Sequence, residues 1–253
     1  MKQRYYRIGA GFLAAVVLMI VLSLSISSIA ETSSLRSILI LLGADISGGG
    51  YIQGITFFFF FWGLLEIYWL NAKNIFERKY LNYDLLPKQE HYVMGPAEIN
   101  SVRVKVNDYL ETRSKEVEED FYLLFLIKKA CTKFRAEFSI SEAFNIVTNQ
   151  TKINTAKSES AQSYIRYIAW AIPSIGFIGT VIGISDALSI AAGADINAVA
   201  EKLGVAFNTT LVSLILSVII MWLIHALQEA SEKMHSEFEE YVIDNLINKM
   251  DVG

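Results

Sequence analysis

The sequence predicts an all-α, polytopic membrane protein with four transmembrane helices and long cytoplasmic helical extensions. Three observations favour this fold class. The 253 residues are 53% hydrophobic with a mean hydropathy of +0.37, which is high for a soluble domain and low for membrane helices alone. Four apolar runs are long enough to cross a bilayer. Most lysine and arginine residues lie in one polar segment between the second and third runs.

Composition also argues against several classes of function. The net charge of −4 gives no support for nucleic-acid binding. Cys131 is the single cysteine, so no internal disulfide is possible. The histidines (His91, His225, His235) are scattered and predict no metal site. The sequence has no G-x-x-x-x-G-K motif for nucleotide hydrolysis. We therefore expect no catalytic residues, no enzymatic activity and no cofactor.

The first predicted span covers about residues 8–30, an uncharged run after the basic start Lys2, Arg4 and Arg7. As a helix this run would measure about 34 Å, enough for a hydrocarbon core of roughly 30 Å. A signal peptide is the alternative for a basic start before an apolar run. The run is too long for a typical signal-peptide core, so a membrane span is favoured.

The second predicted span covers about residues 51–70 and completes an N-terminal transmembrane hairpin over residues 1–70. Between the two spans, residues 31–50 form a linker whose apolar piece, 35–42, is too short to cross a bilayer. Residues 47–50, Ser-Gly-Gly-Gly, predict a flexible turn. Glu66 is charged but lies close to Asn71 at the span's end, so we expect a glutamate that snorkels to the interface rather than a functional charge within the bilayer.

Residues 71–163 form the predicted cytoplasmic helical region. Pro96 is suited to the first turn of a helix, and apolar residues then recur at near-helical spacing from Val102 to Ile127. Ser139 and Glu142 form a capping-box pattern for a helix that continues into the third span. The charges in this region include Glu116, Glu118, Glu119 and Asp120. They predict a solvated face, with docking of another protein as the alternative.

The third predicted span, about residues 164–190, has features that a plain membrane anchor does not need. Small residues at Gly176, Gly179 and Gly183 allow neighbouring helices to approach closely. Thr180 offers a hydroxyl in the middle of the span, and Pro173 frees a backbone carbonyl that a neighbour or water must satisfy. We therefore expect this helix in the interior of a bundle, beside something polar.

The fourth predicted span, about residues 203–227, follows a short outer loop over 191–202. It contains five polar residues: Asn208, Thr209, Thr210, Ser213 and Ser217. Thr210, Ser213 and Ser217 are three and four residues apart and share one helix face. Residues 229–253 then predict a cytoplasmic amphipathic helix that packs on the protein's own soluble helices, with a partner-binding tail as the alternative.

The positive residues near the spans predict the orientation. They lie before the first span, after the second and before the third, while the two opposite loops hold only Arg36 and Lys202. The positive-inside rule then places both termini and the large loop in the cytoplasm.

Two motifs carry a resemblance to a known family. The third span contains P-S-I-G-F-I-G-T-V-I-G-I and the fourth L-G-V-A-F-N-T-T-L. Over about residues 164–228 the chain resembles the channel core of the MotA/TolQ/ExbB proton-channel family, the ring-forming subunits of bacterial ion-driven motors. The resemblance implies a homopentamer in the bacterial inner membrane. It also implies a dimeric single-span partner, similar to ExbD, TolR or MotB, that carries an intramembrane aspartate.

The resemblance also implies roles for individual residues. Asp186 and Glu201 lie near the span ends, so this chain has no mid-span carboxylate in its third or fourth span. The transported H⁺ or Na⁺ would therefore depend on the partner's aspartate. The implied ion-path residues are Thr180, Thr210, Asn208, Thr209 and Ser213; the implied shaping and packing residues are Pro173, Gly176, Gly179 and Gly183.

Alternatives remain at the sequence level. A membrane threonine often bonds only to its own helix backbone, and Asn208 is as well suited to join helices as to line a path. A non-conducting oligomeric scaffold that anchors a cytoplasmic partner is the second hypothesis for function, and an independent channel is the third. The sequence leaves open the choice between H⁺ and Na⁺ and the process that such a motor would drive.

Overall fold

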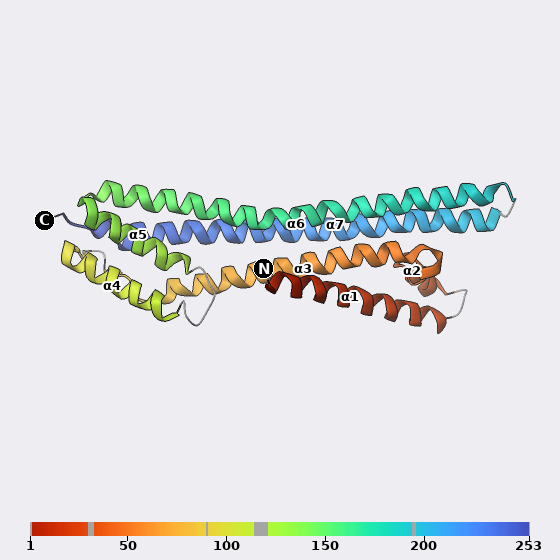
Figure 1. The fold of residues 1–253 in the computed structure, drawn as a ribbon, viewed down its shortest axis with the longest axis horizontal. Coiled ribbons are helices and arrows are strands. Elements are labelled where there is room, and N and C mark those ends of the chain that lie inside the picture. The colour runs from red at the N-terminus through yellow and green to blue at the C-terminus, as the bar shows by residue number, and fades with distance from the viewer. Residues whose placement is uncertain (1, 30–32, 90, 114–120, 194–195, 253) are drawn as a thin grey trace. The chain divides into compact units, whose positions relative to one another are not determined.

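The computed structural model describes residues 2–29, 33–89, 91–113, 121–193 and 196–252 (Figure 1). The predicted fold class is confirmed, because the described residues form helices and no β-strand. Four of these helices are long and apolar enough to cross a membrane. They are α1 (Lys2–Ser27), α3 (Tyr51–Arg78), α6 (Ile140–Ala191) and α7 (Ile196–Asn245).

The chain divides into two compact units. The membrane unit comprises Met1–Trp69 and Gln162–Ala226, and the extramembrane unit comprises Leu70–Ala161 and Leu227–Gly253. The helices α3, α6 and α7 each contribute residues to both units, which accounts for their length. The helical extensions expected beyond the spans are therefore present.

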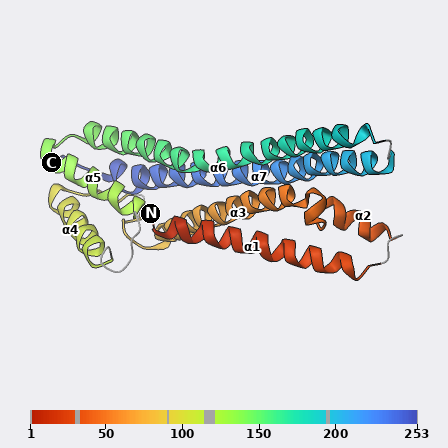
Figure 2. The ribbon, with the colours of Figure 1, turned by 45° about the vertical axis from the view of Figure 1, so that its right-hand side comes forward.

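In the membrane unit, the short helix α2 (Ser34–Leu41) and the turn η1 (Ile46–Gly50) connect α1 to α3 (Figure 2). The expected flexible turn at residues 47–50 is instead part of this helical turn. The Asp45 side chain accepts a hydrogen bond from the Gly48 N–H at 2.9 Å. Gly49 has a φ of 124°, and an added Cβ there would lie 2.7 Å from Val205 Cγ1. Only glycine fits this backbone without strain.

The prediction that Glu66 snorkels to the interface is wrong. The residue is buried in the membrane unit and only 4% exposed. The Arg7 Nε lies 3.1 Å from one carboxylate oxygen, and the Trp62 indole donates to the other at 3.4 Å. Burial of a carboxylate needs such partners, since an unpaired charge in an apolar surrounding is very costly. The basic N-terminus of α1 is therefore tied to α3.

The helix bounds differ from the predicted spans. Helix α3 continues past Leu70 to Arg78 and ends in the turn η2 (Lys79–Asn82). The loop between the last two spans is shorter than expected, because α7 already begins at Ile196. Both differences add helix outside the apolar runs, where hydropathy gives no signal.

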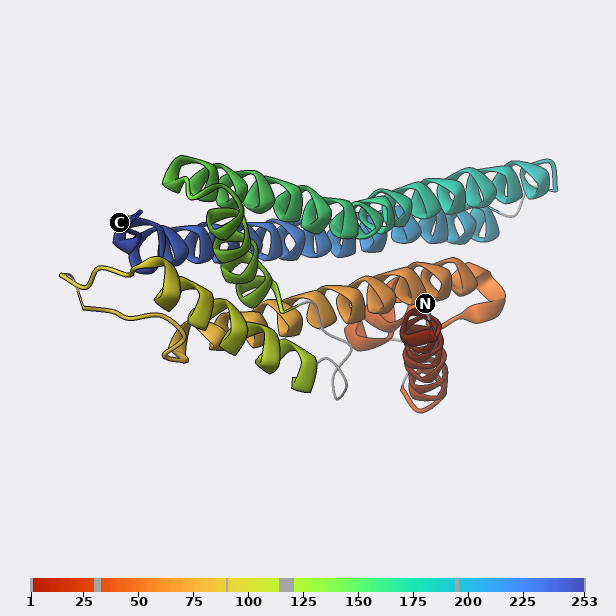
Figure 3. The same cartoon turned by 60° about the vertical axis from the view of Figure 1, so that its left-hand side comes forward.

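The extramembrane unit has its own hydrophobic core. Helices α4 (Pro96–Arg113) and α5 (Tyr122–Glu137) pack on each other and on the ends of the long helices (Figure 3). The prediction that Pro96 opens a helix is confirmed. Fully buried members of the core include Phe134, Val147, Phe238 and Val242. A core of this kind makes the unit more than a set of separate helical extensions.

The apolar residues that recur at near-helical spacing from Val102 to Ile127 belong to two helices rather than one. Helix α4 ends at Arg113, and Phe121 precedes α5 with a φ of 36°. The buried Glu77 of α3 accepts a hydrogen bond from the Tyr122 N–H at 2.8 Å, which satisfies the first turn of α5. Val117 and the acidic residues Glu116, Glu118, Glu119 and Asp120 lie outside the described residues.

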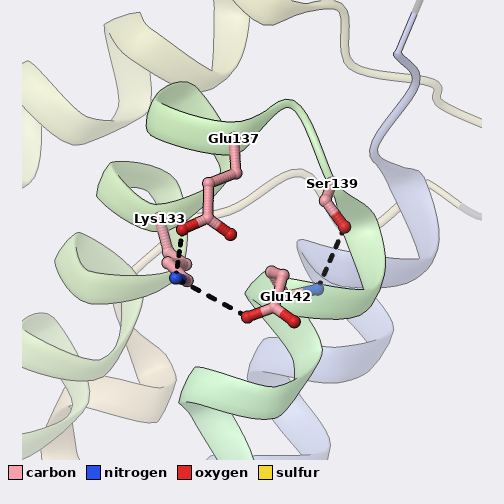
Figure 4. Close-up of polar contacts among 4 residues, drawn as sticks. All are labelled: Lys133, Glu137, Ser139 and Glu142. Atoms are coloured by element: carbon pink, nitrogen blue, oxygen red, sulfur yellow. Dashed lines mark hydrogen bonds and ion pairs between the residues drawn. The ribbon is translucent and has the colours of Figure 1, made fainter.

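Of the two hydrogen bonds in the capping box predicted at Ser139 and Glu142, the one accepted by the Ser139 side chain is confirmed. Ser139 Oγ accepts a hydrogen bond from the Glu142 N–H at 3.3 Å, at the start of α6 (Figure 4). Glu142 does not complete the reciprocal box: its carboxylate lies 3.6 Å from Lys133 Nζ of α5. Lys133 also pairs with Glu137, so these charges join the end of α5 to the start of α6 (Figure 4).

The C-terminal amphipathic helix packs on the protein itself, as predicted. Met234, Phe238, Val242 and Leu246 are buried in the extramembrane core, and α7 continues to Asn245 before the turn η3 (Ile247–Lys249). The chain end is held by backbone hydrogen bonds, in which Met94 N–H donates to the Lys249 carbonyl and Asp251 N–H donates to the Met94 carbonyl.

Candidate ion-path site

Within the membrane unit, α6 and α7 run antiparallel and touch along a row of small residues. An added Cβ at Gly176 would lie 1.8 Å from Ser213 Oγ, and one at Gly179 would lie 2.7 Å from Thr209 Oγ1. At Gly183 it would lie 2.7 Å from Ala206 Cβ. These distances leave no room for a side chain, so the glycines let the two backbones approach closely.

The close approach brings together the hydroxyls of two predicted ion-path residues. Thr180 of α6 and Thr210 of α7 share a hydrogen bond between their Oγ1 atoms. Thr180 Oγ1 also lies 2.9 Å from the Ala206 carbonyl, and Thr210 Oγ1 lies 3.2 Å from the Gly176 carbonyl. Both threonines are half-buried. We call this pair with its two carbonyl partners the threonine cluster.

The other predicted ion-path residues occupy different environments. Thr209 and Ser213 are buried, and their hydroxyls bond to the carbonyls of Ala206 at 2.8 Å and Thr210 at 2.9 Å. They fill the contact between α6 and α7. Asn208 is half-buried. It lies outside the threonine cluster, because it is two positions before Thr210 and such positions are about 200° apart around a helix axis. The role of these three residues in an ion path stays a prediction.

The geometry of the threonine cluster determines its chemistry. A hydroxyl has one donor hydrogen and two acceptor lone pairs. Each cluster hydroxyl is within hydrogen-bond distance of a backbone carbonyl and of the other hydroxyl, so its single hydrogen already has an acceptor. Lone pairs remain available on the oxygens. The cluster is therefore suited to accept hydrogen bonds from water or a protonated carboxyl group, or to contact a cation.

Pro173 lies three residues before Gly176 and has a partner on α7. A proline lacks the N–H that would bond to the carbonyl four residues earlier, which here belongs to Ala169. Ser217 Oγ donates to this carbonyl at 3.0 Å. Sequence reasoning expected a freed carbonyl but did not identify Ser217 as its partner. The available signal was that Ser217 shares a helix face with Thr210 and Ser213.

Titratable groups near the site are few. Asp186 and Glu201 are exposed, and Glu66 is paired with Arg7. A small cavity of about 60 Å³ lies between α3, α6 and α7, and its lining includes Ile52, Asp186, Thr209 and Lys202. Among the described residues, no group of three or more His, Cys, Asp or Glu side chains could hold a metal ion.

Residues 123–240 match the model of the MotA/TolQ/ExbB proton channel family. This part of the chain belongs to that family. The matched region contains the whole threonine cluster, Pro173 and the three glycines, and it extends through most of α5. No curated protein and no solved structure matches the chain.

The match of residues 123–240 to the MotA/TolQ/ExbB family indicates a general function. Together with four membrane-crossing helices, it indicates a multi-pass membrane protein of the proton-channel, motor-subunit type. Proteins of this family work with partner subunits, and the family is one of channels rather than enzymes.

Proposed function

We propose that this chain is the ring-forming subunit of a motor driven by the ion-motive force. Five copies would surround a dimer of a single-span partner that carries an intramembrane aspartate. The complex would conduct H⁺ or Na⁺ across the bacterial inner membrane and convert the flow into rotation or force. Both termini and the extramembrane unit would lie in the cytoplasm, in agreement with the positive residues that flank the spans.

The threonine cluster is the observation that carries the proposal. Two hydroxyls from different helices share a hydrogen bond within the membrane unit, and both remain half-buried rather than sealed in the core. A threonine that only stabilised its own helix would need no such partner on another helix. The hydrogen-bond acceptors of the cluster would stabilise a hydrated ion or the partner's protonated carboxyl group.

The need for a partner follows from the charges. Movement of one elementary charge through 100 mV releases about 2.3 kcal/mol. A motor uses this energy only if the ion binds to a group and then leaves it. Within the described part of α6 and α7 that crosses the membrane, Asp186 and Glu201 lie toward the span ends. Neither is a hydrogen-bond partner in the threonine cluster. The titrating carboxylate would therefore come from the partner.

Valine substitutions test the proposal. Valine is also β-branched and resembles threonine in shape, so Thr180→Val and Thr210→Val remove the hydroxyl with little change in packing. Where the site is dry, loss of a hydrogen-bond partner costs about 1–3 kcal/mol, which corresponds to a decrease in ion flux of about fivefold to a hundredfold. We expect the double variant to lose more flux than either single variant while it still assembles with its partner.

The measurement is partner-dependent ion flux in proteoliposomes, with pull-down of the partner and native mass spectrometry of the ring. Ser185→Ala is the matched control, because Ser185 is an exposed hydroxyl of α6 nearer the outer end. Full flux in the double valine variant would rule out the threonine cluster as the ion path. Absence of partner-dependent flux in the native complex would instead favour a non-conducting scaffold that anchors a cytoplasmic partner.

A further inference from the structure

The extramembrane unit contains a cavity whose lining shares no residue with the threonine cluster. Its volume is about 580 Å³, within the range of small-ligand sites. Four helices line it: α3, α5, α6 and α7. Three lysines from three different helices face this cavity, namely Lys73, Lys129 and Lys157. We call it the basic pocket.

The single carboxylate in the lining already has a structural role. Glu77 accepts the Tyr122 N–H at 2.8 Å and so caps the first turn of α5. Lys129 donates to the Gln150 side chain, and Gln150 in turn donates to Asn154 at 3.1 Å. An ammonium group has three hydrogens, so Lys129 keeps donors beyond this bond. The lining therefore has an excess of positive charge and of hydrogen-bond donors.

A buried polar group also lines the basic pocket without a partner. His235 is 5% exposed, and its Nδ1 has no hydrogen-bond partner in the described part of the chain. Burial lowers the pKa of His235 below its usual value, so the ring is neutral at pH 7 and one ring nitrogen carries a hydrogen. Buried polar atoms are rarely left unpaired, and a bound ligand is one explanation.

The lining also includes apolar residues, two of which lie next to the membrane spans along the chain. Leu70 and Ala161 are the residues at which α3 and α6 enter the extramembrane unit. Phe125, which is 43% exposed, and Met234 add apolar surface. A pocket that combines ammonium groups with apolar side chains at the end of a membrane span matches an amphipathic anion. A small soluble anion would use only the polar part.

We propose that the basic pocket binds a phosphate anion, with Lys129 and Lys157 as direct ligands and the headgroup of an anionic phospholipid as its source. Such lipids concentrate at the cytoplasmic leaflet, where each nearby lysine contributes about 1 kcal/mol of attraction, or about fivefold in affinity. This site is separate from the threonine cluster and does not depend on ion conduction.

Charge-removing variants of the full-length purified protein test the site. The test pair is Lys129→Gln with Lys157→Gln. The control pair is Lys152→Gln with Lys233→Gln, two exposed lysines of the same unit that do not line the basic pocket. Retention of phosphatidylglycerol is measured by native mass spectrometry after reconstitution with phosphatidylglycerol and phosphatidylcholine. In a second arm, inorganic phosphate is titrated onto delipidated protein.

We expect the test pair to lower phosphatidylglycerol affinity about fivefold for each lysine removed, with the control pair unchanged and inorganic phosphate bound weakly. If inorganic phosphate binds with the same sensitivity to the test pair, the site stands and a soluble phosphate is its source. Equal binding of both anions by test and control pairs overturns the proposal. Should the test pair fail to fold, Lys157→Gln against Lys152→Gln gives the same comparison.

Discussion

Single glycines set the distance between α6 and α7. At Gly176, Gly179 and Gly183 the neighbouring helix fills the place where a Cβ would stand. Without this contact, the Thr180 hydroxyl would not reach the Ala206 carbonyl of the other helix, now 2.9 Å away. The chemistry of the threonine cluster therefore depends on residues that have no side chain of their own.

Gly176→Ala should weaken the membrane unit. The new methyl group would stand 1.8 Å from Ser213 Oγ and 2.9 Å from the Thr209 carbonyl, so the helices must separate. Overpacking of this kind costs about 1–3 kcal/mol. The thermal unfolding midpoint in detergent is the measurement. Gly204→Ala is the control, because nothing lies within 4 Å of its added Cβ. A Gly176 variant as stable as this control would contradict the close contact.

His235 should make the extramembrane unit sensitive to mild acid. Burial lowers its pKa in the folded state, whereas the unfolded histidine takes up a proton near 6.5. Below pH 6.5 the unfolded state therefore binds more protons, and stability falls as the pH drops, by at most about 1.4 kcal/mol per pH unit. His235→Phe keeps a ring against Tyr122, whose centroid is 5.1 Å from that of His235. Between pH 7.5 and 5.5 this variant should lose less stability than the native protein. An identical decrease in both proteins would show that His235 is not the source of the acid sensitivity.

At the scale of the helix, α6 tolerates a proline because α7 supplies the missing hydrogen bond. Pro173 lies inside a helix that continues from Ile140 to Ala191. The carbonyl of Ala169 would otherwise face an apolar surrounding without a donor, and Ser217 provides that donor at 3.0 Å. The contact couples the shape of one helix to a side chain of the next.

A double-mutant cycle tests this coupling. Ser217→Ala alone should cost about 1 kcal/mol, the usual value of such a bond in a membrane protein. In a Pro173→Ala background the new alanine N–H can bond to the Ala169 carbonyl, so loss of the Ser217 hydroxyl should then cost almost nothing. Unfolding free energies of the four proteins supply the coupling. Equal costs in both backgrounds would show that Ser217 acts independently of the proline.

At the scale of the whole molecule, two units have cores of different composition. The extramembrane core is continuous and aromatic-rich, with Phe121, Phe134 and Phe238 almost fully buried. In the membrane unit, large apolar side chains such as Phe12, Leu13 and Phe177 remain exposed. Exposed apolar side chains are stable in lipid, where no hydrophobic effect drives them inward. The family match covers residues of both units, so the membrane unit and the extramembrane unit both contribute to the matched region.

The proposed orientation predicts which engineered cysteines react from outside. The native Cys131 is unsuitable as a reporter, because it is fully buried and burial raises its pKa to about 12. Ala192→Cys, in the loop after α6, should react with a membrane-impermeant maleimide on intact spheroplasts. Glu111→Cys on α4 should react only after permeabilisation, because this exposed site would be cytoplasmic. The reverse pattern would invert the proposed topology.

The helices and their membrane-crossing parts could be predicted from local patterns. Span length follows from bilayer thickness, and a helix start such as Ser139 depends on residues only three positions apart. Gly176, Thr180 and Thr210 were likewise recognisable as unusual residues in apolar runs. The family resemblance implied that Thr180 and Thr210 line an ion path, but it did not predict their hydrogen bond to each other. Hydropathy could not predict that bond either, since it contains no information on the register of two helices.

The sequence by itself determined the fold class, the four spans and the residues whose chemistry is out of place in lipid. Only the tertiary structure decided which of those residues meet. Glu66 is buried because Arg7, fifty-nine positions earlier, reaches it. Ser217 bonds to the carbonyl that Pro173 frees, and three lysines from separate helices line one cavity. These contacts also join residues far apart along the chain. Secondary structure and hydropathy depend on neighbours in sequence, whereas burial and pairing depend on how helices pack, which is set by the sum of many weak contacts.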